Sequence, residues 1–194
     1  MDLLQEFKFE SNRFDSNLAI VSAKAMKEIW TSGPVFNVDP FDYERNGFKK
    51  GTILKKSPSN TNKKLCYFLT GSEHIVMIKT GIEIPEHYYT EFFFYNNPFL
   101  KSVLYGTDRE MINIKIREVE DGRITKLFMK ATLGSREEKY YYDDRKLVSI
   151  NVKQWEGEVE KTGFNALFIY NGDELDEVVN VYSNGYRDMK YKRK

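Results

Sequence analysis

The sequence predicts a mainly β protein, in which a long antiparallel up-and-down meander forms a strongly curved sheet or partial barrel beside one N-terminal amphipathic helix. Two observations support this fold class. From Met111 onward, apolar and aromatic segments are separated by Gly, Asn and Asp breaks roughly every 10–14 residues, as expected for strands joined by hairpins. The chain also contains 13 Tyr and 14 Phe, which favour sheet over helix.

Alternation of apolar and polar residues identifies individual strands in this region. Isoleucine alternates with polar residues in 112–117, and Val148, Ile150 and Val152 do the same in the segment 148–153. A period of two places the apolar residues on one face of a half-buried strand. Both segments are therefore predicted to be half-buried strands.

Two-residue turns are predicted at Asp121-Gly122 and Asn171-Gly172. Hairpin turns of this length need residues with a positive φ, which Asn, Asp and Gly adopt most readily. Such turns join neighbouring strands directly, so the expected topology is up-and-down.

Residues 16–31 are predicted to form the only strong helix. Apolar residues recur there at helical spacing, the Asp-Ser pair at 15–16 offers an N-cap, and Gly33-Pro34 ends the helix. We expect its apolar stripe to cover the concave face or an open end of the sheet, with Trp30 as a core anchor. Residues 3–9 should form a short strand or an arm.

The middle of the chain is interpreted as an irregular connector at 35–50, a polar loop at 58–64 and several strands. These strands are predicted at 52–56, 65–70, 74–79, 88–95 and 99–105. A sheet of about ten to twelve strands tends to curl or close. Residues 1–194 are therefore expected to form a single domain, with the β-meander at about 51–192; the alternative is two sheets divided near 106–110.

Composition narrows the class of protein. Hydrophobic residues make up 41% of the chain, which favours a folded globule over a disordered segment. The net charge of +1 argues against nucleic acid or an anionic membrane as partner. The sequence has no apolar run near 18 residues and no signal-peptide pattern at its start, so we expect a cytoplasmic protein with no membrane contact.

The sequence lacks the common catalytic and metal-binding motifs. His74 and His87 stand at the borders of β segments, without metal-ligand spacing. A Cys66/His74 nucleophile pair can be drawn, but Cys66 lies between Leu65 and Tyr67 in an apolar strand, as a structural thiol would. We expect no enzyme activity, metal or cofactor; a hydrolase or transferase with a dispersed carboxylate site remains the alternative.

Two segments carry a family resemblance. Residues 140–150 (YYYDDRKLVSI) resemble a tyrosine–aspartate hairpin repeat, and residues 168–175 (FIYNGDEL) look like a second copy. Such repeats are found in bacterial polymorphic toxins and in the small β-rich proteins encoded beside them. In general character the chain is similar to toxin-neutralising immunity proteins, which implies that it binds a cognate toxin and covers its active site.

Acidic turns are the predicted surface for such a partner. Alternate turns of a meander share one rim, and the turns near 121, 144 and 172 are the more acidic set. The predicted partner-binding residues are Asp121, Asp143, Asp144, Asp173 and Glu174. Complementary charge would speed encounter with a basic partner. The alternative is that these residues solvate the turns and protect strand edges, and unprotected edges would allow a homodimer.

A second function hypothesis is a carrier of an apolar small molecule or lipid. A sheet curled around a helix can enclose a ligand cavity. The predicted cavity-lining residues are Trp30, Tyr89, Phe93 and Tyr95. The alternative for these aromatics is ordinary core packing. The basic tail at 187–194 is interpreted as a lysine-protected edge strand, with contact to RNA as its alternative.

Overall fold

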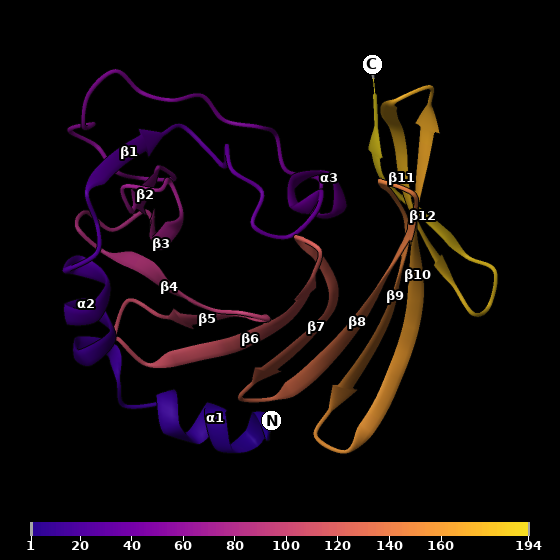
Figure 1. Cartoon of the computed structure of the whole chain (residues 1–194), viewed down its shortest axis with the longest axis horizontal. Helices are drawn as coiled ribbons and strands as arrows, with labels where there is room; N and C mark the ends of the chain where they lie inside the picture. Colours follow the sequence, from indigo (N-terminus) through magenta and orange to yellow (C-terminus); the bar gives the residue numbers. More distant parts are fainter. Residues whose placement is uncertain (1, 194) are drawn as a thin grey trace.

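The computed structural model describes residues 2–193, and within them twelve strands form one antiparallel sheet whose spatial order follows the chain (Figure 1). The predicted up-and-down meander is therefore confirmed, as one sheet rather than two. The strands are β1 (Lys27–Thr31), β2 (Leu65–Leu69), β3 (Ile75–Gly81), β4 (Tyr88–Asn96), β5 (Phe99–Tyr105), β6 (Met111–Glu120), β7 (Arg123–Ala131), β8 (Gly134–Asp143), β9 (Lys146–Glu156), β10 (Val159–Asn171), β11 (Glu174–Tyr182) and β12 (Arg187–Lys192). The sheet curves strongly but does not close, so β1 and β12 are its two edges.

The sheet begins earlier in the chain than the sequence predicted. Its first strand, β1, starts at Lys27 rather than near residue 51, and it pairs along its whole length with β2. The predicted strand at 52–56 is reduced to a single bridge between Thr31 and Ile53.

Alternation predicted the isoleucine face of β6 correctly but misplaced one residue of β9. Ile114 and Ile116 are buried on one face, as expected. In β9, however, a bulge opposite Tyr141 and Tyr142 inserts Val148 as an extra residue, so Leu147 takes the buried position and Val148 is exposed. One extra residue reverses the faces of a strand beyond it, and no period of two can reveal it.

The turns follow the sequence prediction with one shift. Asp121 and Gly122 both have positive φ, of 50° and 73°, as a two-residue hairpin turn requires. In the other turn Asn171 remains the last residue of β10, and Gly172, with φ 61°, stands first in the Gly172-Asp173 loop.

Three short helices occur within residues 2–193, namely α1 (Leu3–Glu10), α2 (Phe14–Ser22) and α3 (Asp42–Asn46). The predicted helix at 16–31 is wrong over its second half, because that part is strand β1. Pairing of the β-forming residues 29–31 with β2 overrides their helical spacing. Residues 3–9 belong to α1, where the Asp2 carboxylate caps the helix by accepting from the Leu4 amide at 3.0 Å.

Helices α1 and α2 pack on the convex face of the sheet, not on the concave face or at an open end as predicted (Figure 1). Val21 of α2 belongs to a core with Phe92, Val103 and Ile114 of the sheet. The concave face is instead crossed by the connector between β1 and β2, residues 32–64, which contains α3. The N-terminal half of the sheet is thus covered on both faces.

A second core lies on the concave face of the C-terminal half. It joins Leu127, Tyr140, Ile150 and Phe168, and Phe41 of the connector packs against it. The connector therefore bridges the two halves of the curved sheet from inside.

Candidate ligand-binding site on the concave face

A buried ion pair fixes the connector to the sheet. The Asp39 carboxylate accepts from Nε of Arg117 and, at 3.0 Å, from its Nη2. Arg117 also donates from Nη1 to the Ser102 hydroxyl at 2.9 Å. Arg117 is 1% and Asp39 6% exposed, so both charges are removed from water.

A second ion pair anchors α3. Both Glu138 oxygens accept from Nη2 of Arg45, at 2.9 and 2.8 Å, and Tyr140 donates its hydroxyl to the same carboxylate at 2.6 Å. Arg136 forms a second ion pair with the same carboxylate, its Nη2 lying 2.6 Å from Glu138.

These contacts decide the protonation of the two buried acids. Burial would raise the pKa of Asp39, but Arg117 outweighs it by attraction and hydrogen bonding and lowers that pKa to about 2. Burial would likewise raise the pKa of Glu138, but attraction to Arg45 and Arg136 outweighs burial and lowers that pKa. Both acids are therefore held as paired anions that position the connector.

The first cavity, here called the apolar cavity, lies between the connector and the inner face of β2, β3 and β4. Its volume is about 710 Å³. Its apolar and aromatic lining consists of Pro34, Phe36, Val38, Tyr43, Phe48, Leu65, Tyr67, Ile78, Ile82 and Tyr89. Two polar atoms of lining residues are buried without a hydrogen-bond partner among residues 2–193, namely the Tyr43 hydroxyl and one Glu91 carboxylate oxygen.

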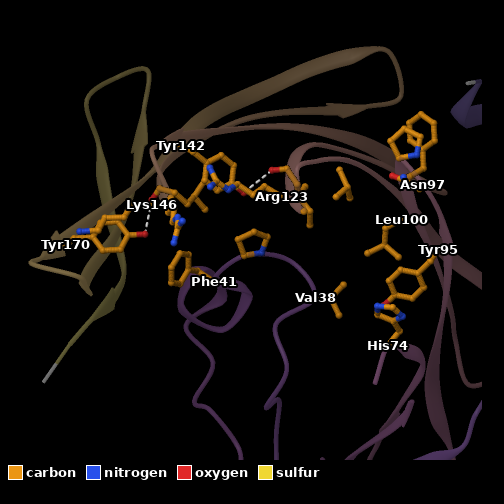
Figure 2. A pocket seen from close by; sticks show the side chains of 18 of the residues that line it. Val38, Phe41, His74, Tyr95, Asn97, Leu100, Arg123, Tyr142, Lys146 and Tyr170 are labelled. Atoms are coloured by element: carbon orange, nitrogen blue, oxygen red, sulfur yellow. Dashed lines mark hydrogen bonds between the residues drawn. The ribbon is translucent and has the colours of Figure 1, made fainter. Parts of the chain in front are cut away.

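The second cavity, here called the rim cavity, lies on the other side of the connector and has a volume of about 770 Å³ (Figure 2). Val38, Pro40 and Phe41 of the connector form one wall, and the sheet arches over the cavity on the other side. Its charged and aromatic lining residues are Phe41, His74, Tyr95, Phe99, Arg123, Tyr142, Arg145, Lys146, Tyr170 and Asp173. Val38 lines both cavities, so the connector is the partition between them.

The acidic turns do share one rim, because every second turn of an up-and-down sheet falls at the same end. Asp121, Asp143 and Asp144 are exposed there. The other two predicted partner-binding residues are neutralised in part: Asp173 pairs with Lys146 at 2.8 Å, and Glu174 pairs with Arg193.

The predicted cavity-lining aromatics are divided between several places. Tyr89 lines the apolar cavity and Tyr95 the rim cavity. Phe93 is buried between them on the same face of β4 and lines neither. Trp30 lies half-buried on the edge strand β1, where its indole nitrogen donates to Glu28.

Sequence reasoning missed the ion pairs that organise the site. Arg117 stands in the polar phase of 112–117, which was expected to face solvent, but this phase is the concave face under the connector. One signal was present in the sequence: Asp39 stands in a segment rich in aromatics, where a carboxylate needs a partner.

The cysteine and the two histidines each have a local structural setting. Burial raises the pKa of the Cys66 thiol to about 12, so it stays protonated at neutral pH. His74 lies against the Tyr95 ring, with centroids 5.0 Å apart, and His87 contacts the Pro85 carbonyl in a turn. Among residues 2–193 there is no group of three or more His, Cys, Asp or Glu placed to hold a metal ion.

None of the helices in the described part of the chain is both long enough and apolar enough to cross a membrane. No family model matches the chain, and neither does any curated protein. Function is therefore inferred from the geometry of the concave face.

Proposed function

We propose that this protein is a non-enzymatic binding protein that holds an apolar small molecule in the apolar cavity. The observation that carries the proposal is the size and lining of that cavity, about 710 Å³ of space walled mainly by aliphatic and aromatic side chains. Ligand pockets in proteins typically enclose about 300–1,000 Å³ and combine such walls with a few polar groups.

The unpartnered polar atoms define the ligand further. Neither atom is exposed at the cavity surface, so a ligand recovers the cost of a buried unpaired polar group, about 1–3 kcal/mol, through a small side-chain movement that uncovers the atom. The Glu91 carboxylate oxygen accepts a hydrogen bond, whereas the Tyr43 hydroxyl can donate one. An apolar molecule carrying a hydroxyl or amide group offers both complements.

The two acids that hold the connector are structural rather than catalytic. Asp39 and Glu138 are each paired with an arginine and have a lowered pKa. Neither is poised to exchange a proton near neutral pH, as a general acid or base must.

Filling the apolar cavity should strongly weaken ligand binding. We expect the wild type to bind the fluorescent probe N-phenyl-1-naphthylamine, and Ile78→Trp to weaken binding at least about tenfold, because the indole would occupy the cavity. Tyr43→Phe should weaken binding of a long-chain alcohol by about fivefold, through loss of one hydrogen bond. The measurements are fluorescence titration and displacement.

The matched control is Ile169→Trp, which adds the same ring at an exposed position of β10. Solvent extraction and mass spectrometry of the purified wild type should also recover a bound apolar molecule. If the wild type takes up no apolar probe and yields no extractable ligand, the carrier proposal is wrong.

We propose a second candidate, an immunity protein that covers the active site of a cognate toxin. Its support is the exposure of Asp121, Asp143 and Asp144 on two turns of one rim, together with the hairpin resemblance of residues 140–150. Exposed carboxylates at turn tips can meet a basic partner without rearrangement of the sheet.

Charge reversal on this rim should remove such a partner. With the protein as bait in its native host, we expect one stoichiometric basic protein to be captured, and the triple change D121K/D143K/D144K to weaken capture about tenfold or more. The control D108K/E158K/E160K reverses three exposed charges near the opposite rim and should leave capture unchanged. Equal capture by both triple variants would contradict the acidic-rim interface.

A further inference from the structure

We infer that the rim cavity is a second binding site, and that it takes an aromatic organic anion, meaning a planar ring that carries a carboxylate or a phosphate. This site is separate from the apolar cavity, because the connector stands between the two and Val38 is the one lining residue, among residues 2–193, that they share. The inference does not depend on the proposed carrier function.

Fixed aromatic rings line the rim cavity (Figure 2). Tyr95, Tyr142 and Tyr170 each donate their hydroxyl to a backbone carbonyl at 3.0 Å, respectively of Ile75, Ile124 and Leu147. These bonds occupy the hydroxyl donors and hold the rings in place. A ligand therefore meets preorganised ring surfaces rather than mobile side chains.

A fourth ring, that of Phe41, enters the cavity from the connector (Figure 2). Phe41 adopts a left-handed backbone, with φ 55°, which is costly for a bulky residue. Its ring is held by packing, with its centroid 5.3 Å from that of Phe168 and 6.4 Å from that of Tyr170. Backbone strain of this kind is concentrated at functional sites.

Basic side chains supply the charge. Arg123, Arg145 and Lys146 line the cavity, and Asp173 is its only carboxylate within residues 2–193. Asp173 pairs with Lys146 and partly neutralises it, but the Asp173 side chain is 97% exposed and lies mostly in solvent. Arg145 makes no ion pair within the described part of the chain, which leaves its guanidinium available to an anion.

The cations and the rings are placed together. The Arg123 guanidinium lies 5.6 Å from the centroid of the Tyr142 ring, and the Lys146 ammonium lies 5.6 Å from that of Tyr170. A ligand ring can therefore lie among the aromatics while its anionic group reaches the bases. Arginine suits this role because its planar fork pairs with carboxylate and phosphate.

The same turns carry acids that do not line this cavity. Asp121, Asp143 and Asp144 are exposed neighbours of Arg123 and Arg145 in sequence, yet the lining contains the bases and not these acids. The turns thus separate opposite charges, and the cavity is positive although the chain is nearly neutral overall.

Calorimetric titration with four probes tests the inference. Adenosine monophosphate and 2-naphthoate each carry a ring and an anion, whereas adenosine and inorganic phosphate each carry one feature alone. We expect at least one of the first two to bind with a Kd below about 1 mM at low salt, about tenfold or more tighter than either single-feature probe. The phosphate and carboxylate arms distinguish which anion the site prefers.

Variants locate the binding. Arg145→Glu, on an exposed turn, should weaken binding of the anion about tenfold or more. Arg187→Glu reverses a comparable exposed charge on β12 and should leave that binding unchanged. Ile78→Trp in the apolar cavity should also leave it unchanged. The inference is overturned if no ring-bearing anion binds, if Arg145→Glu binds like the wild type, or if Arg187→Glu weakens binding as strongly.

Discussion

Asp39→Ala should destabilise the fold by about 3–5 kcal/mol, one of the largest single-residue effects expected in this chain. The substitution leaves the Arg117 guanidinium, which is 1% exposed, charged and without its carboxylate partner. Breaking a buried ion pair from one side costs more than the pair itself contributes, because the remaining charge stays desolvated. Urea denaturation measures the free energy of unfolding directly.

Two comparisons isolate this effect. Glu83→Ala breaks the exposed pair with Lys63, whose two side chains are each 76% exposed, and should cost no more than about 1 kcal/mol. The double change D39L/R117M removes both charges and should recover most of the lost stability. If Asp39→Ala proves as mild as Glu83→Ala, the pair does not anchor the connector.

The pair also predicts how stability depends on pH. Folding lowers the Asp39 pKa from 3.8 to about 2, so the folded state binds fewer protons at this group than the unfolded state. The contribution of the ionised Asp39 to the free energy of unfolding is therefore complete above about pH 4 and is lost as the pH falls toward 2. Asp39→Asn should lack this component of acid destabilisation.

Phe92→Ala should cost about 3–5 kcal/mol, because it opens a cavity where α2 meets the sheet. Phe92 is fully buried on the convex face, and its ring centroid lies 5.5 Å from that of Phe14 and 5.7 Å from that of Tyr105. The same measurement, urea denaturation, reports the loss. Helical circular dichroism should fall in parallel if α1 and α2 depend on this contact.

The control for Phe92 is Leu133→Ala, in the exposed turn between β7 and β8. Leu133 is 79% exposed, and its truncation should change stability by no more than about 0.5 kcal/mol. A small effect of Phe92→Ala would contradict the packing of the two helices on the convex face.

Local sequence chemistry was enough to predict the meander. The alternation in 112–117 and the Asp121-Gly122 turn each act over a few residues, and a hairpin needs nothing more to set its direction. Up-and-down order then places alternate turns at one end, so the shared rim of Asp121 and Asp144 also followed from the sequence.

Local patterns failed where distant segments compete for the same residues. The spacing of 16–31 is helical, yet residues 27–31 pair with a strand about forty positions later, and that pairing prevails. The bulge at Val148 is likewise decided by the partner strand β8. Propensity is a weak prior that tertiary contacts override.

The sequence alone thus determined the up-and-down strand order from β2 onward, the Asp121-Gly122 turn and the rim on which the acids stand, because all three follow from contacts between neighbours in the chain. Only the tertiary structure decided which face is concave and what covers it. An alternating strand shows that its two faces differ, but Arg117 is buried only because residues 32–64 cross that face and bring Asp39 to it. Both cavities exist for the same reason, since each is closed on one side by this connector.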